Sequence, residues 1–266
     1  MCILQCNGFR ICPSGFSAPT KAEYCENTAL VLAFLLDEFS RIFGNDIMAN
    51  EDCIVFNDPR SECPMLITNF RPIHIRLSQE SLSALSQTIY QLSHEMCHYA
   101  IRQRKINKDF TLSWFEEIVC EATSLYALEY SFIEWHKCLL SQSQPYWSYA
   151  HKTYLENQLN KESTNEFQEC DTVEKLIAYE TQDFSENKRE THRAERNVIY
   201  KAISSNPMEL KCVLDYSKYI ESNGVTIDFD KWIREDPCDI LQELKNIQPV
   251  KGVLNYNESI KTSRTM

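Results

Sequence analysis

The types and spacing of His94, Glu95 and His98 are those of a site that binds a metal ion. They lie in a segment, Gln79 to Arg104, in which apolar residues recur at helical spacing. Because residues four apart on a helix lie one turn above each other, the two imidazoles can bind one tetrahedral ion, with Glu95 beside them. The helical wheel places both histidines roughly opposite the apolar stripe. We therefore expect them to face away from the core, as an open metal site requires.

A second predicted helix, from Leu112 to Leu140, carries carboxylates that could complete the site. Glu117 follows His98 after eighteen intervening residues, and Glu121 lies one helical turn further on. The helical wheel puts Glu117 and Glu121 on one face, opposite the apolar stripe, whereas Glu116 projects about a quarter turn away. An acidic helix face exposed to solvent would show the same pattern, so the assignment of these carboxylates depends on the two histidines.

This arrangement resembles that of the gluzincin metallopeptidases. Residues 94–98 match the HExxH motif of that class, and residues 114–121, Trp-Phe-Glu-Glu-Ile-Val-Cys-Glu, are similar to the glutamate-bearing helix of its aminopeptidase branch. The resemblance covers only residues 94–121. The Gly-x-Met-Glu-Asn segment with which aminopeptidases hold a free amine is absent, so an endopeptidase is favoured over an exopeptidase.

The resemblance implies one zinc ion bound by His94, His98 and Glu117. Glu95 would be the general base for a water molecule that attacks a peptide bond. Glu121 would hydrogen-bond a metal-binding histidine from the second shell, fixing its tautomer. The alternative, with Glu121 as the ligand and Glu117 outside the site, stays open.

Gluzincins usually add a tyrosine or histidine from the C-terminal lobe as a second donor to the oxyanion. The side chains of this kind are Tyr146, Tyr149, His151, Tyr154, Tyr179 and His192. Packing or surface exposure explains each of them equally well, and the sequence selects none. His74 lies in the predicted strand upstream of the motif, where related enzymes pair an edge strand with an extended substrate. An alternating strand position explains this histidine equally well and is preferred.

The composition limits the partners that this chain can have. Its formal net charge of −11 argues against a nucleic acid or an anionic membrane surface as the main partner. The longest apolar run, residues 29–36, is too short to span a bilayer, and no basic segment followed by an apolar stretch opens the chain. We expect a cytoplasmic protein with a peptide or protein substrate, although secretion by a non-standard route remains open. The sequence does not predict an oligomeric state.

The even number of cysteines, twelve, is compatible with a disulfide framework, but free buried thiols are the preferred interpretation. Several lie inside predicted helices, where a free buried thiol is expected: Cys97, Cys120, Cys138 and Cys212. Cys97 lies within the HExxH motif, but the helical wheel turns it away from the ligand face. The spacing of Cys2, Cys6 and Cys12 matches no zinc knuckle.

The predicted fold is α+β and predominantly helical, with a zincin-like core. Three strands are expected at residues 53–56, 65–68 and 73–77, in a small sheet packed on the HExxH helix. Further helices are expected at residues 21–43, 146–160, 172–182, 190–204, 207–221 and 238–245. We divide the chain into an irregular segment (1–20), a lobe with the metal site (21–142), a helical lobe (143–250) and a flexible tail (251–266).

Three functions fit these features. The first is a zinc-dependent endopeptidase, and the second is a zinc amidohydrolase that acts on a small molecule. The third is a regulatory or binding protein that retains a zincin fold without turnover. The presence of Glu95 favours the enzymes, because a site without turnover has no chemical need for a base there.

Overall fold

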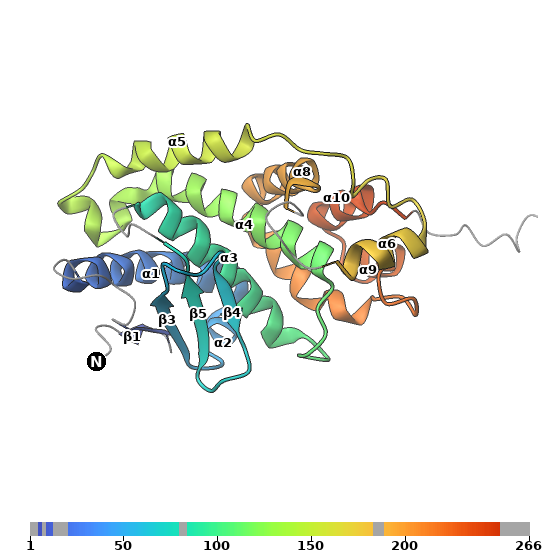
Figure 1. Ribbon diagram of the computed structural model, residues 1–266, viewed down its shortest axis with the longest axis horizontal. Coiled ribbons are helices and arrows are strands. Elements are labelled where there is room, and N and C mark those ends of the chain that lie inside the picture. Colours follow the sequence, from blue (N-terminus) through green and yellow to red (C-terminus); the bar gives the residue numbers. More distant parts are fainter. Residues whose placement is uncertain (1–4, 7–8, 13–20, 80–83, 183–188, 251–266) are drawn as a thin grey trace, which may run out of the picture.

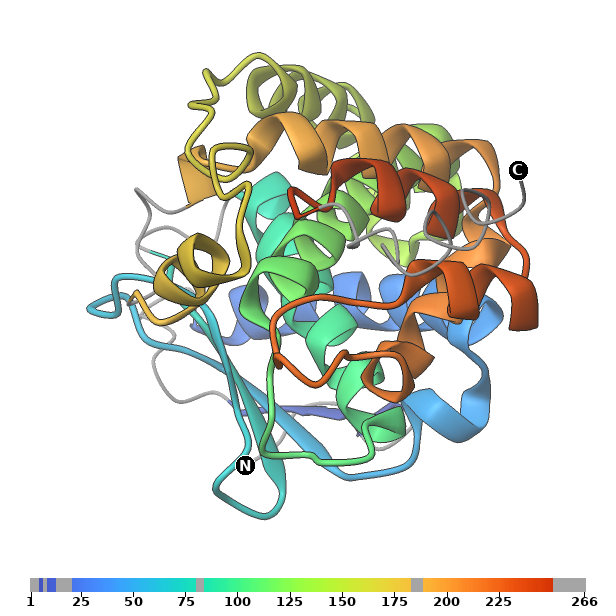
Figure 2. The ribbon, with the colours of Figure 1, turned by 90° about the vertical axis from the view of Figure 1, so that its right-hand side faces the viewer.

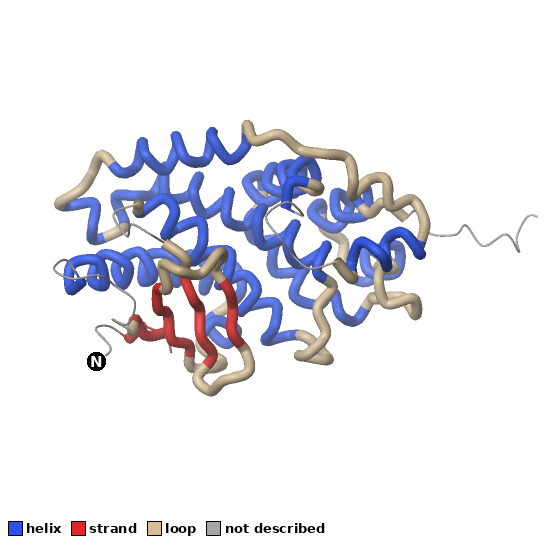
Figure 3. The backbone as a smooth tube through the Cα atoms, viewed as in Figure 1, coloured by secondary structure: helices blue, strands red, loops and turns tan. Residues whose placement is uncertain are grey.

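The computed structural model describes residues 5–6, 9–12, 21–79, 84–182 and 189–250, and it is mostly helical with one small sheet (Figures 1 and 3). The N-terminal half contains β1 (Gln5–Cys6), β2 (Phe9–Ile11), α1 (Lys21–Phe43), α2 (Asn45–Met48), β3 (Cys53–Asn57), β4 (Met65–Ile67), β5 (Ile73–Leu77), α3 (Leu85–Arg104) and α4 (Ser113–Glu134). The proposed tail, residues 251–266, lies outside the described residues.

The C-terminal half is helical, as the sequence predicts. Its elements are η1 (Trp135–Lys137), η2 (Leu139–Gln142), α5 (Trp147–Leu159), α6 (Val173–Glu180), α8 (Arg193–Ser205), η3 (Pro207–Lys218), α9 (Phe229–Glu235) and α10 (Asp239–Ile247). The short helices α2 and α9 are additions to the prediction. The α4 helix ends at Glu134 and is followed by two 3-10 turns, so it does not continue to Leu140. None of the helices in the described part combines the length and apolarity needed to cross a bilayer.

The sheet has the strand order β1-β2-β3-β5-β4. The strands β2, β3 and β5 run parallel, whereas β1 and β4 are antiparallel to their neighbours and form the two edges. The three predicted strands are confirmed as β3, β4 and β5. The other two lie in the segment expected to be irregular. They are two and three residues long, too short for a sequence period to reveal them.

Burial alternates along the central strands, because one face of the sheet packs on the helices. The side chains of Val55 in β3 and of Ile73 and Ile75 in β5 are fully buried. His74 points to the other face, where its ring contacts those of Phe56 and Phe70. Its alternating strand position is therefore confirmed.

The α3 helix lies at the centre of the molecule, between α1, α4 and the sheet (Figure 1). Three residues of its predicted apolar stripe, Ile89, Leu92 and Met96, are fully buried. The opposite face, which we expected to be open, is covered by α4, and His94 is only 3% exposed. The α4 helix is itself covered by α5 and α8, and α10 packs beside α8 (Figure 2). The two helices on either side of the site, α3 and α4, are therefore both fixed by packing against other elements.

Candidate metal centre

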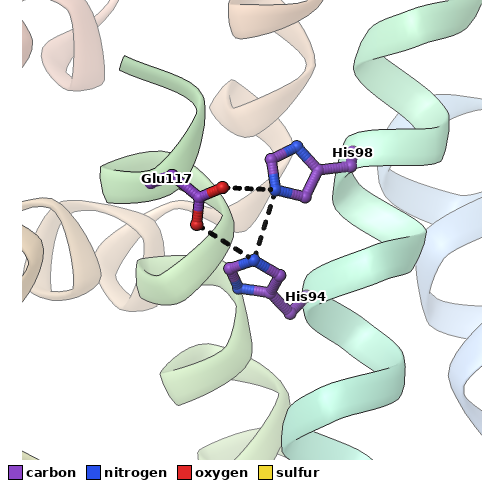
Figure 4. A group of neighbouring side chains, drawn as sticks. All are labelled: His94, His98 and Glu117. Carbon is purple, nitrogen blue, oxygen red and sulfur yellow. Dashed lines mark hydrogen bonds and ion pairs between the residues drawn. The ribbon is translucent and has the colours of Figure 1, made fainter. Parts of the chain in front are cut away.

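Two helices bring His94, His98 and Glu117 together (Figure 4). The histidines project from α3 and the glutamate from α4. The Nε2 atoms of His94 and His98 are 3.2 Å apart. Glu117 reaches both rings, with Oε2 at 3.2 Å from Nε2 of His94 and Oε1 at 3.3 Å from Nε2 of His98. One donor atom from each residue thus converges on the same small space.

The geometry and chemistry of this group fit a metal ion. A tetrahedral zinc ion with bonds of about 2.1 Å separates its ligand atoms by roughly 3.4 Å, close to the spacing found here. Oε2 of Glu117 is buried and, within the described part of the chain, has no aligned hydrogen-bond donor, so its lone pairs are available. Two imidazoles and one carboxylate also leave a coordination position open. His94, His98 and Glu117 could therefore hold a metal ion.

The histidines and the neighbouring carboxylates shift the pKa values of one another. Burial opposes the charged form of His98, but the carboxylates of Glu117 and Glu116 raise its pKa well above the usual range. Burial likewise opposes the charged form of Glu117, while His98 and His94 lower the pKa of Glu117 well below its usual value. The site therefore favours positive charge between these side chains, supplied by a proton or by a cation.

Glu116 supports the group from the other side of His98. Its Oε2 atom is 3.1 Å from Nδ1 of His98, and its Oε1 atom contacts both Nζ of Lys105 and the hydroxyl of Tyr216. A proton held on Nδ1 by this carboxylate leaves a lone pair on Nε2, the nitrogen that faces Glu117. In the neutral ring, Glu116 thus favours the tautomer of His98 that a metal ion would require.

This role of Glu116 does not follow from the sequence pattern. A helical wheel gives the direction of a side chain from its own axis, but it does not locate a ring on the neighbouring helix. The ring of His98 lies between consecutive residues of α4, so Glu117 reaches one edge and Glu116 the other.

Glu121 has other partners than the expected histidine. Its carboxylate is buried and pairs with Nη1 of Arg196 at 3.4 Å and with Nε of Arg189 at 3.5 Å. A buried carboxylate needs a counter-charge, and α8 supplies one from a distant part of the sequence. In the structure Glu116, and not Glu121, contacts a metal-site histidine.

Glu95 lies in the same cavity as the three possible ligands. This cavity has a volume of about 290 Å³, and one of its walls is formed by residues in and near β4, namely Cys63, Pro64, Met65, Leu66 and Thr68. Burial raises the pKa of Glu95, and the negative charge of Glu117 raises it further, whereas His94, His98 and Arg189 oppose this effect. Glu95 thus lines the cavity beside the possible metal ligands, although the residue is only 3% exposed.

A second cavity, of about 570 Å³, adjoins the first. Both are lined by Cys63, Pro64, His94 and Arg189, so the metal group lies where they meet. The second cavity continues towards α5 and α8, past Tyr90, Tyr154 and Arg193. Together the two cavities, which we call the cleft, extend to both sides of His94.

The proposed oxyanion donors lie in different surroundings. Tyr154 lines the second cavity, together with His94. Tyr149 is 72% exposed, and Tyr146 is also exposed. His151 is buried against the rings of Trp135 and Trp147, and burial lowers its pKa to about 3.

Tyr179 and His192 are also buried and contact each other, with the hydroxyl 3.2 Å from Nδ1. Tyr154 is thus the one candidate that lines the cleft. Arg189, which the sequence did not single out, lines both cavities.

The nine cysteines whose side chains the structure describes are free, including the four for which we expected thiols. Cys97, Cys120 and Cys138 are buried, and Cys212 is partly buried with its sulfur 3.0 Å from that of Cys238. Cys97 contacts the hydroxyl of Thr123 and not the metal group. Cys2 lies outside the described residues.

No protein-family model, curated protein or solved structure matches this chain. The geometry of the site is therefore the basis for any statement about function.

Proposed function

We propose that this chain is a zinc-dependent metallopeptidase with a zincin-like core, in which His94, His98 and Glu117 bind one zinc ion. The observation that carries the proposal is the convergence of these side chains: the two Nε2 atoms are 3.2 Å apart, and each is 3.2 to 3.3 Å from one oxygen of Glu117, with Glu95 in the same cavity. Oxygen and nitrogen donors at this spacing suit zinc, and the HExxH order of the ligands and base supports hydrolysis.

Different residues of the cleft would have different roles in hydrolysis. When bound, zinc acts as a Lewis acid on the scissile carbonyl and lowers the pKa of a water molecule. Glu95 accepts the proton of the attacking water and returns it to the leaving amine. Arg189 and Tyr154, which line the cleft, would stabilise negative charge on the substrate oxygen.

Two features favour a polypeptide substrate. The β4 strand is at the edge of the sheet and lines the cleft, so its outer backbone groups can pair with an extended chain. The cleft also continues to both sides of His94, as a substrate held on both sides of its scissile bond requires.

A small amide is the alternative substrate. The cavity that contains Glu95 has a volume of about 290 Å³. That volume is near the lower end of pockets for small ligands, roughly 300 Å³. A zinc amidohydrolase would therefore use the same residues on a shorter substrate.

The test compares the wild type with Glu95→Gln. We expect both proteins to hold one zinc ion per chain, measured by mass spectrometry of the metal after dialysis. The wild type should cleave members of a broad peptide library, and the variant should lose about a hundredfold or more in rate.

Each other outcome has a definite meaning. Wild-type protein without stoichiometric zinc would overturn the proposal. Bound zinc without cleavage of any peptide would favour the small amide, or a binding protein without turnover. Equal cleavage by both proteins would remove Glu95 from the mechanism.

A further inference from the structure

Arg102 lies on the same face of α3 as the two histidines. The positions 94, 98 and 102 are four residues apart, so the three side chains form one row along the helix. At a rise of 1.5 Å per residue, the backbone of Arg102 is roughly 6 Å beyond that of His98. Its side chain lines the cavity that also contains Glu95 and Glu117. Arg102 therefore lines the cavity one helical turn beyond the metal group.

The guanidinium of Arg102 is buried but incompletely bonded. The residue is 6% exposed, and Nη1 donates to the carbonyl oxygen of Lys108 at 2.6 Å. Nε is buried and, among the described residues, has no hydrogen-bond partner. A buried donor without an acceptor costs free energy, which a ligand with suitable oxygens would recover.

The neighbouring cations already have carboxylate partners. Lys105 pairs with Glu116, and Lys108 pairs with Glu51 at 2.9 Å. Arg102, by contrast, has no carboxylate within ion-pair distance in the part of the chain that the structure describes. Its charge helps to lower the pKa of Glu51 but is not neutralised by a direct contact, so it can act on the cavity, although the chain as a whole carries a formal charge of −11.

We propose that Arg102 binds a carboxylate of the substrate. Arginine suits this role because its planar group can hold both oxygens of a carboxylate at once. The carboxylate would come from an acidic side chain or from the C-terminus of the substrate. Zinc and Glu95 would then act on a bond one helical turn away. This inference rests on the proposed function, since it names the substrate class of that same site.

The first test measures binding without turnover. Zinc-loaded Glu95→Gln protein is titrated by calorimetry with short peptides that carry one glutamate or one glutamine at successive positions. Each peptide is made with a free C-terminus and as the amide. We expect a carboxylate at one position to tighten binding by roughly 10- to 100-fold. A preference that follows the glutamate identifies an acidic side chain, and one that follows the free C-terminus identifies the chain end.

The second test assigns this preference to Arg102. In Arg102→Gln the ratio of affinities for the charged and uncharged peptides should fall to about one, and Arg102→Lys should restore part of it. The matched control is Arg104→Gln, on the same helix, because Arg104 is exposed and pairs with Asp215. This control should keep the wild-type ratio.

A purely structural role for Arg102 would give a different result. Loss of its bond to Lys108 would weaken binding of charged and uncharged peptides equally, and the ratio would stay unchanged. That result, or the absence of any carboxylate preference before mutation, would overturn the inference. Cleavage of peptides without such a preference would refute the inference alone, whereas carboxylate-dependent binding without cleavage by the wild type would refute only the proposed function.

Discussion

Replacing Glu116 by glutamine should weaken zinc binding although Glu116 is not a ligand. The carboxylate accepts from His98 through one oxygen and from Lys105 and Tyr216 through the other. The amide of glutamine has one oxygen and one nitrogen, so it cannot accept on both sides. If its oxygen stays with Lys105 and Tyr216, its nitrogen faces Nδ1 of His98. The amide nitrogen of the glutamine then donates to Nδ1, so Nδ1 becomes an acceptor. The imidazole proton moves to Nε2, the atom to which the metal should bind.

The expected loss follows from this change of tautomer. Removing a carboxylate that supports a metal-binding histidine typically lowers metal affinity by about 10- to 100-fold, or about 1.4 to 2.8 kcal/mol. The substitution also leaves Lys105 buried without its counter-charge, which should lower the free energy of unfolding by about 3 kcal/mol or more. Affinity is measured by competition with a chelator of known strength, and stability by unfolding in urea.

Glu121→Gln is the matched control for Glu116→Gln. Glu121 is equally buried on the same helix and also pairs with a buried cation, but its partners are Arg189 and Arg196. The control should therefore lose stability and keep its zinc affinity. The reasoning fails if both variants bind zinc as the wild type does, or if Glu121→Gln loses as much affinity as Glu116→Gln.

Three further predictions concern ligation, metal removal and pH. Glu117→Ala should lose zinc on dialysis far more completely than Glu116→Ala, and equal retention would make Glu121 the alternative ligand. Removing zinc with a chelator should abolish hydrolysis. It should also lower the free energy of unfolding by about 4 kcal/mol, relative to protein in the presence of free zinc at a thousand times its Kd. An unchanged midpoint of unfolding in urea would contradict this. Because burial lowers the pKa of His151 to about 3, against about 6.5 when unfolded, its contribution to stability is full above pH 6.5 and is lost as the pH falls towards 3. His151→Phe should therefore lose less stability than the wild type between these pH values, and parallel urea titrations would refute the assignment.

Long periodic elements were predictable from the sequence. The α1 helix has the predicted bounds, Lys21–Phe43, because its apolar residues repeat over several turns and Gly44 ends it. The same argument located α3 and the strands β3, β4 and β5. Short elements such as β2 and α2 escaped prediction, since they are formed by tertiary contacts and not by a local pattern.

Contacts between distant segments were harder to predict from the sequence than the metal group itself. The grouping of His94, His98 and Glu117 could be expected, since two come from one helix and the third from a resemblance. The pairing of Glu121 with Arg196 joins residues 75 positions apart, for which the sequence holds no local signal. The burial of Arg102 depends likewise on how the loop around Lys108 folds over the end of α3.

X-ray absorption at the zinc edge of the zinc-loaded protein tests the central claim most directly. It reports the atoms bound to the metal and their distances, in a chain whose twelve cysteines offer many competing ligands. We predict one zinc ion with two imidazole nitrogens and carboxylate or water oxygens at about 2.0 to 2.2 Å. Sulfur ligands at about 2.3 Å, or fewer than two imidazoles, would contradict the assignment of His94, His98 and Glu117.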